Sequence, residues 1–317
     1  MSDAPDFAVV GGGIVGCSLA AFLAEAGASV VVYEREAIAA GASGRNSGVV
    51  QHPLDPALVS LYEESVEHYA TLGRGFSLPA DPVGVLLVTD DPDNLEPEPS
   101  EFPELRPTLL EGAALRAAEP TLADGLVAWR LETGRPVPPA AAANAFAARA
   151  REAGAEFRIG ESAFLEVENG RAAGVTVAGE LHPAGAVALA AGPWTPEAFV
   201  KGPGPLIRAL WGVVVELELP DAPRHVLEET GIKALTQKEG APSVLFSAVT
   251  ARGISAVGST FTAKRPIRWR WRRRCWRTRR GSCPAWRASR RAECGHARGR
   301  ARWTAGRSSA RCRAWKA

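Results

Sequence analysis

The stretch Phe7-Ala8-Val9-Val10-Gly11-Gly12-Gly13-Ile14-Val15-Gly16 decides the fold of this chain. Its four leading apolar residues are typical of a buried parallel strand, and its spaced glycines form the pattern G-x-G-x-x-G. Apolar residues at helical spacing follow over residues 14–26, and a second apolar run, Ser29–Tyr33, ends at Glu34. The segment therefore predicts a strand, a glycine turn, a helix and a second strand.

Such a unit is suited to the pyrophosphate of a dinucleotide. Glycines let the backbone approach the phosphates, and the helix N-terminus offers free N–H groups and a favourable dipole. Glu34 lies 18 residues past Gly16, where a carboxylate can accept hydrogen bonds from a ribose diol. An ordinary strand–helix–strand turn is the alternative. The candidate cofactor-binding residues of this unit are Gly11, Gly13, Ile14, Val15, Gly16 and Glu34.

A second glycine-rich element, Gly41–Val50, follows the Glu34 strand. A domain that binds only NAD would normally continue here into another strand–helix repeat. Small residues, hydroxyl groups and an amide can instead pass close to a second phosphate or a flavin. The loop therefore favours FAD over NAD, with an ordinary polar loop as the alternative.

Five segments together resemble the D-amino-acid oxidase superfamily of FAD-dependent oxidoreductases, close to its glycine oxidase and sarcosine oxidase-like members. The resemblance extends over about residues 1–263 and is absent after them. The segments that carry it are Gly11–Gly16, Glu34-Arg35, Ala42–Gly48, Ala190–Trp194 and Ala256–Thr260.

The resemblance implies that FAD lies extended across the sheet, with its pyrophosphate at the glycine turn and its ribose at Glu34. It places Ala163 near the adenine and Gly192 near the flavin. It implies no metal and singles out no catalytic residue. For His52 we expect a surface or second-layer position rather than a covalent bond to the flavin. The further cofactor-binding candidates are Arg35, Ala42, Ser43, Asn46, Ser47, Gly48, Ala163, Ala191, Gly192 and Trp194.

The predicted fold class is α/β: a Rossmann-like FAD-binding domain with a mostly parallel sheet and helices, plus an α+β substrate domain with an antiparallel sheet. Residues 55–73 are expected to form a helix whose apolar face is core. The FAD-binding domain is expected to comprise residues 1–79 and 140–204, and the substrate domain residues 80–139 and 205–263.

Charge divides the chain near residue 264. Residues 265–317 hold 18 Arg and one Lys against one acid, a net charge of +18, whereas residues 1–264 carry −16. The tail also holds four of the five Cys and six of the nine Trp, and Ile267 is its one aliphatic residue larger than Ala. An arginine-rich tail usually indicates nucleic-acid binding. This tail has no matching motif, so no nucleic-acid partner is expected.

The codons of the tail point instead to a shifted reading frame. Trp is encoded only by TGG, so a shift by two bases turns Trp303-Thr304 into Asp and Trp315-Lys316 into Glu. The bases between them permit Asp-Gly-Arg-Pro-Leu-Ile-Gly, which resembles the closing motif of the same superfamily. We therefore expect residues 264–317 to be out of frame and disordered. In the family this region supplies flavin-binding backbone and commonly a substrate-binding Arg, so the activity of this exact chain is in doubt.

The function that the resemblance implies is oxidation of a small amine or amino acid by hydride transfer to FAD, with oxygen or another molecule as electron acceptor. A hydroxy-acid or glycerol phosphate dehydrogenase is one alternative, and an inactive remnant is another. The N-terminus has no basic signal-peptide region and no apolar run reaches the roughly 18 residues of a membrane span, so a cytoplasmic protein without a membrane partner is expected. Cys17 is expected to be a packing residue. The oligomeric state is left open.

Overall fold

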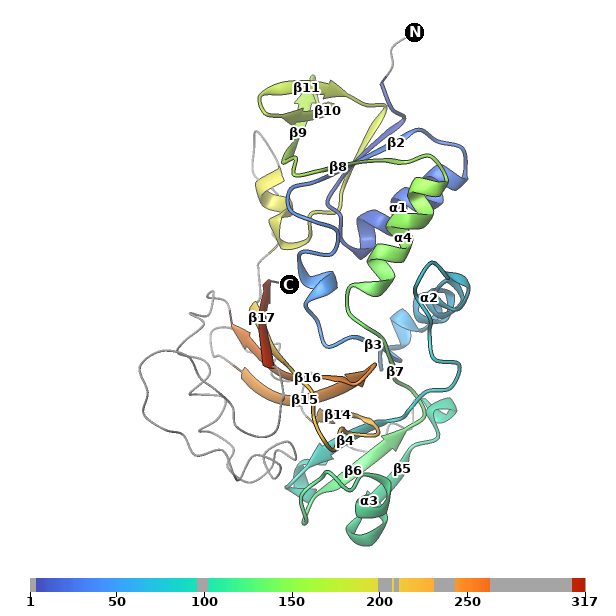
Figure 1. Ribbon diagram of the computed structural model, residues 1–317, viewed down its shortest axis with the longest axis vertical. Coiled ribbons are helices and arrows are strands. Elements are labelled where there is room, and N and C mark those ends of the chain that lie inside the picture. Colours follow the sequence, from blue (N-terminus) through green and yellow to red (C-terminus); the bar gives the residue numbers. More distant parts are fainter. Residues whose placement is uncertain are drawn as a thin grey trace, which may run out of the picture.

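The computed structural model describes residues 4–95, 102–198, 207, 211–230, 243–262 and 310–316. Its strands form two larger sheets, which lie at opposite ends of the molecule (Figure 1). The predicted division into two domains assigns the four-stranded sheet to one and the eight-stranded sheet, apart from its last strand, to the other. That division itself stays a prediction, whereas the mixed α/β fold class is confirmed.

The four-stranded sheet is parallel throughout and has the order β12-β1-β2-β8. The predicted unit of a strand, a glycine turn, a helix and a second strand is confirmed as β1, α1 and β2. The bounds are β1 Phe7–Val10, α1 Ile14–Glu25, β2 Val30–Glu34, β8 Glu156–Ile159 and β12 Ala186–Leu189.

Each face of this sheet is covered by a different layer. Helices α1 and α4 (Ala141–Glu152) pack on one face, where small side chains such as Ala20 and Ala147 let them approach closely. A three-stranded antiparallel sheet covers the other face and contributes Val175 to its core. Its strands are β9 Ala163–Glu168, β10 Arg171–Val177 and β11 Glu180–Pro183. The sheet thus forms the middle of three layers (Figure 1).

The eight-stranded sheet has the order β17-β13-β16-β15-β14-β4-β6-β5. It is mostly antiparallel as predicted, but β14 and β4 pair in parallel. The long stretch of chain between these two strands allows β14 to enter the sheet from either end, which a tight hairpin would not. The bounds are β4 Val85–Thr89, β5 Thr108–Glu111, β6 Val127–Leu131, β13 Trp211–Leu217, β14 Val226–Glu229, β15 Ser243–Ala251, β16 Ile254–Thr262 and β17 Ala310–Lys316.

Strand β17 differs from the expectation of a disordered tail. Residues 310–316 pair antiparallel with β13 at the sheet edge. An edge strand offers unpaired backbone N–H and C=O groups that accept an extended segment without requiring particular side chains. The expectation is therefore wrong for these seven residues, and the rest of the expected tail lies outside the described residues.

Helix α2 (Val59–Thr71) lies beside the junction of the two sheets (Figure 1). It forms where the sequence predicts a helix. The prediction of a core-facing apolar side holds only at its C-terminal end: no residue of α2 itself is buried, but Leu72, directly after it, is fully buried in the core. Leu61 is 59% exposed, while Tyr69 packs partly against the core around α1 and α4. The remaining elements are β3 Val49–Val50, β7 Arg135–Pro136, α3 Gly112–Ala118 and the 3-10 turns Ala42–Gly44, Pro56–Leu58, Pro92–Asn94, Pro103–Leu105 and Gly192–Ala198.

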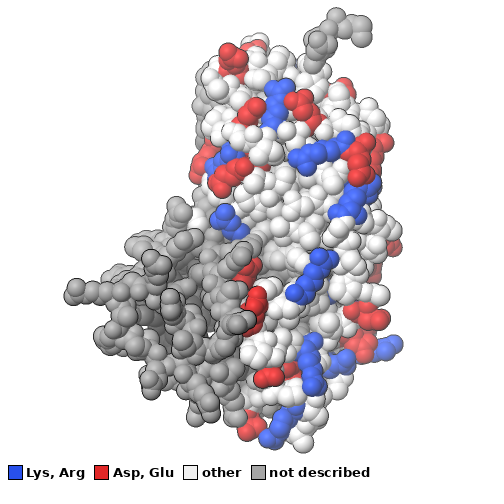
Figure 2. Space-filling model, in the orientation of Figure 1, with Lys and Arg blue, Asp and Glu red and all other residues white. Residues whose placement is uncertain are grey.

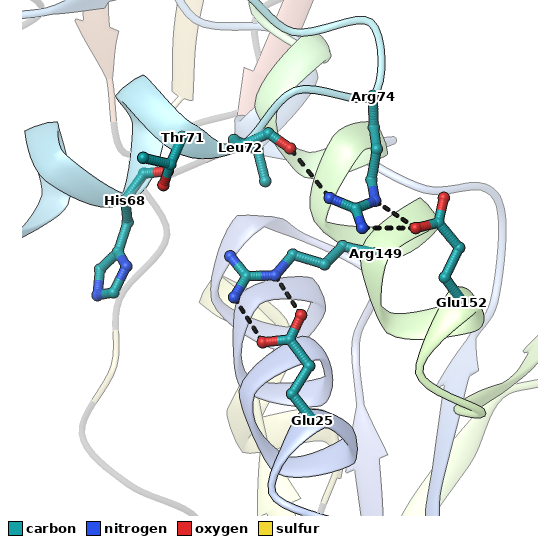
Figure 3. A network of polar contacts seen from close by, with 7 residues as sticks. All are labelled: Glu25, His68, Thr71, Leu72, Arg74, Arg149 and Glu152. Atoms are coloured by element: carbon teal, nitrogen blue, oxygen red, sulfur yellow. Dashed lines mark hydrogen bonds and ion pairs between the residues drawn. The ribbon is translucent and has the colours of Figure 1, made fainter.

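Two ion pairs fasten the helical layer (Figure 3). Arg149 of α4 binds both carboxylate oxygens of Glu25 on α1. Arg74, which follows α2, donates from Nε to Glu152 at 2.6 Å and from Nη1 to the carbonyl oxygen of Leu72 at 3.3 Å. Side chains thus link α4 both to α1 and to the segment that follows α2.

Candidate functional site

The turn between β1 and α1 is built from glycines for steric reasons. Gly11 has φ +116°, and a Cβ atom on it would lie 2.5 Å from the carbonyl oxygen of Ala190. A Cβ atom on Gly16 would lie 2.0 Å from the carbonyl oxygen of Gly11. Neither position has room for a side chain, so the backbone of this turn stays bare. A bare turn at a helix N-terminus is the geometry that phosphate groups bind.

The N-terminus of α1 is joined to the second glycine-rich loop. Gly13 precedes the helix without a side-chain cap, and the first turn carries no acidic residue. The Ile14 N–H donates to Ser43 Oγ at 2.9 Å. Val15, the next residue, is 65% exposed, which is unusual for an apolar side chain at a helix start. The predicted phosphate-binding residues of the two loops therefore meet at one helix end.

Glu34 lies at the carboxyl end of β2, directly beside the glycine turn. Its Oε2 accepts from the Gly12 N–H at 2.7 Å, and its Oε1 accepts from the Glu36 N–H at 2.8 Å. The carboxylate thus orients the glycine turn. Its contact with a ribose stays a prediction.

Asn46 folds the second loop onto itself. Its Nδ2 donates to the carbonyl oxygen of Ala42 at 3.0 Å, and its Oδ1 accepts from the Gly48 N–H at 2.8 Å. Gly48 has φ +78°, and a Cβ atom there would lie 2.2 Å from the carbonyl oxygen of Val137. The Asn46 side chain therefore shapes the loop, whereas Ser47 beside it is partly exposed and makes none of the hydrogen bonds that define the turn.

A third group of predicted residues gathers at the 3-10 turn after β12. The guanidinium of Arg35 stacks on the Trp194 ring, with Cζ 4.4 Å from the ring centroid. A Cβ atom on Gly41 would lie 3.2 Å from that ring. Ala191 precedes the turn and Gly192 begins it, with φ +55°. Residues from two distant segments, 35–41 and 191–194, are thus brought together at the carboxyl ends of the parallel strands.

Ala163 lies apart from these groups. It is the first residue of β9 and is buried in the core that contains Val10 and Tyr33. It packs between the parallel sheet and the three-stranded sheet, and its predicted position near an adenine stays untested. The other predicted residues surround one edge of the parallel sheet. Their bare turn, helix end and carboxylate fit the pyrophosphate and ribose of FAD.

The sequence prediction for His52 was wrong as regards a surface position. His52 is 5% exposed, and its ring contacts the rings of Tyr62 and Phe102. The Leu54 N–H donates to Nδ1 at 3.2 Å, so the neutral ring carries its proton on Nε2, 3.6 Å from an oxygen of Glu104. Burial lowers the pKa of His52, which favours this neutral form.

Two polar contacts, one buried and one partly buried, were not found from the sequence. Glu119, which follows α3, is fully buried and accepts hydrogen bonds from Arg224 N–H, His225 N–H and Thr121 Oγ1. Gln51 Nε2 donates to Oε1 of Glu228 on β14 at 3.0 Å. Apart from Thr121, the partners lie more than 100 residues away along the chain, so no local pattern could reveal them.

The family of FAD dependent oxidoreductases, abbreviated DAO, matches residues 6–293. The chain belongs to this family. The match extends past residue 263, where the resemblance was expected to end. The expected end of the resemblance was therefore wrong. No curated protein matches the chain.

Solved structures of amine and amino-acid enzymes share this fold. Iminodiacetate oxidase from Chelativorans sp. BNC1 is 21% identical with a TM-score of 0.73, over 98% of this chain and 82% of that one. Glycine oxidase from Bacillus cereus ATCC 14579 is 20% identical with a TM-score of 0.71, over 98% and 83%. L-proline dehydrogenase from P. horikoshii is 20% identical with a TM-score of 0.71, over 90% and 79%.

The protein is thus an FAD-dependent oxidoreductase, and its cofactor is FAD. Among the described residues no helix is long and apolar enough to cross a membrane. On the face drawn in Figure 2, the acidic and basic side chains that the structure describes are interspersed rather than gathered by sign. Among the side chains that the structure describes, that face therefore shows no extended positive patch for a polyanion.

Proposed function

We propose that the enzyme oxidises a small amine or amino acid and passes the electrons to oxygen or another acceptor. The observation that carries the proposal is the bare glycine turn joined through Ser43 to the second loop, in a chain of this family. Glycine oxidase, L-proline dehydrogenase and iminodiacetate oxidase share the fold, and their names support an amine or amino acid as substrate.

In this proposal the chain binds and positions the cofactor and the substrate. Gly11, Gly13 and the N–H groups at the start of α1 bind the pyrophosphate, and Glu34 binds the ribose. Bound FAD would supply the acceptor for a hydride from the carbon next to the substrate nitrogen. The eight-stranded sheet holds the substrate on the other side of the junction and excludes water. The oxidised substrate then hydrolyses and releases ammonia or an alkylamine.

The test is anaerobic reduction of the bound flavin, which is monitored by the loss of its absorption band. Glycine, sarcosine, proline and D-amino acids are added in turn to the 317-residue chain and to a version with the C-terminal frame restored. Reduction by at least one of them, with release of ammonia or an alkylamine, is expected. Reduction only by 2-hydroxy acids or glycerol phosphate would contradict the proposal and favour the alternative dehydrogenase.

A further inference from the structure

The two faces of the eight-stranded sheet have different surroundings. On one face Leu86, Leu227 and Ala248 pack with Leu115 of α3. On the other face the core includes Val49 and Leu54, together with Val85, Leu87, Val226 and Val249. Val49 lies at the end of the loop Gly41–Val50, which was predicted to line the cofactor, and Leu54 lies shortly after that loop. This second face is therefore the one turned toward the FAD-binding end of the molecule.

Glu228 lies on that second face. In β14 the side chains alternate, so Glu228 shares the face of Val226, opposite Leu227. Its neighbours across the sheet are Leu87 on β4 and Ser247 on β15. The Glu228 carboxylate therefore lies between an apolar and a hydroxyl neighbour, on the sheet face that is turned toward the FAD-binding end.

Glu228 has a polar partner from the cofactor side but no cationic one. Gln51 Nε2 donates to its Oε1 at 3.0 Å. Among the residues that the structure describes, no Lys, Arg or His forms an ion pair with Glu228. Burial raises the pKa of Glu228, and the hydrogen bond from Gln51 only partly opposes this. A carboxylate that is desolvated without a cation gains from any cation that reaches it.

Gln51 adds an acceptor without a donor beside the Glu228 carboxylate. Its Oε1 is buried and has no hydrogen-bond partner. A buried acceptor without a donor costs free energy, and such groups call for an explanation such as a bound ligand or water. The Glu228 carboxylate and the Gln51 amide oxygen together suit a ligand group that carries several N–H donors and a positive charge. A carboxylate or phosphate would be repelled.

We propose that Glu228 and Gln51 form the binding site for the amino group of the substrate. The site rests on the proposed oxidation of an amine, and it assigns the substrate nitrogen to β14 and to the residue that follows β3. Gln51 positions the Glu228 carboxylate through Nε2 and offers Oε1 to the same amino group. The carboxylate of an amino-acid substrate would then bind away from Glu228.

The experiment measures binding by calorimetry, which does not depend on flavin reduction. Glycine, sarcosine and benzylamine are titrated into the 317-residue chain in the presence of FAD, and acetate and benzoate serve as probes without an amine. Glu228→Gln removes the charge and keeps the size of the side chain. Gln51→Leu removes the second acceptor, and Glu168→Gln removes an exposed charge in the β9–β10 hairpin as the matched control. Circular dichroism checks that each variant is folded.

We expect Glu228→Gln to weaken the binding of the amine probes by at least about tenfold, as the loss of a charged hydrogen bond implies. Gln51→Leu should weaken them too, whereas Glu168→Gln should not. Acetate and benzoate should bind the variants no more weakly than the wild-type chain. Should Glu228→Gln fail to fold, Gln51→Leu decides by the same criterion.

The assignment is overturned if the amines bind Glu228→Gln as tightly as wild type, or if no amine binds the wild-type chain. The proposed oxidation fails in a different way: amines bind and depend on Glu228, but none reduces the flavin. The two results are read from different measurements, so the failure of one is not mistaken for the failure of the other.

Discussion

Glu34 accepts two backbone hydrogen bonds and still lies at the edge where FAD is expected to bind. We predict that Glu34→Gln weakens FAD binding by about 1.5–3 kcal/mol, the worth of a charged hydrogen bond to the ribose. Titration of FAD monitored by flavin fluorescence measures this without turnover. Glu36→Gln is the control, because that side chain is 59% exposed and lies two residues away. Equal affinity of Glu34→Gln and wild type would refute the ribose contact.

Cys17 shows a second consequence of a residue's surroundings. It is fully buried on α1, and burial, reinforced by the charge of Glu34, raises the pKa of its thiol to about 12. The thiolate is the reactive form, so Cys17 should resist alkylation in the folded chain near neutral pH. Iodoacetamide labelling followed by peptide mass spectrometry should find Cys17 unmodified without denaturant and modified in urea. Labelling of the native chain at the rate of an exposed thiol would contradict a packing role.

At the scale of elements, Glu119 connects the end of α3 to the start of β14. Burial alone would raise the pKa of its carboxyl, but hydrogen bonds from His225, Thr121 and Arg224 outweigh burial and lower it below the ordinary value. A lowered pKa in the folded state adds stability above the unfolded value, near 4.5, and that stability is lost as the pH falls through the folded value.

We therefore predict that Glu119→Gln lowers the free energy of unfolding by about 1.5–3 kcal/mol at neutral pH. The difference from wild type should shrink as the pH falls below 4.5. Urea unfolding at several pH values measures it. Glu111→Gln, an exposed carboxylate just before α3, is the matched control and should change little. A difference between wild type and Glu119→Gln that is constant from pH 7 to pH 3 would show that the carboxylate charge has no part in it.

The elements differ in how far the sequence alone predicted them. The strand, glycine turn, helix and strand of residues 7–34 came out as expected, because periodicity and turn chemistry act over a few residues. Helix α2 also formed, but the exposure of Leu61 depends on what lies beside the helix rather than on its own pattern. The parallel pairing of β14 with β4 depends in the same way on distant chain.

At the scale of the whole molecule, the charge division near residue 264 leads to a prediction about the gene. We predict a single-base insertion or deletion between the codons for Thr262 and Arg268, relative to the genome. The abrupt change from −16 to +18 and the recovered family motif are its basis. Sequencing of the source DNA across these codons is the direct test. An intact frame there would refute the prediction.

The same prediction has a consequence for the cofactor. If residues 264–317 replace a segment that normally holds the flavin, the 317-residue chain should bind FAD more weakly than a frame-restored version. Dialysis followed by absorbance gives the FAD bound per chain for both. Stoichiometric FAD in the 317-residue chain would show that its tail suffices. In that case the pairing of β17 with β13 would be the first contact of the tail to test for a role in FAD binding.

The sequence by itself determined the glycine turn, the acid at the end of β2, the family and the cofactor. The turn and the acid depend on local spacing, because a bare turn, a helix start and a carboxylate at a strand end are all specified within about 30 residues. The family and the cofactor depend on several such short motifs, each of which is recognisable by itself. Only the tertiary structure decided that Ser43 binds the N-terminus of α1, that Glu119 is buried beside His225, and that Gln51 meets Glu228. Each of these contacts joins residues far apart in the chain, so it exists only once the folded chain has brought them together.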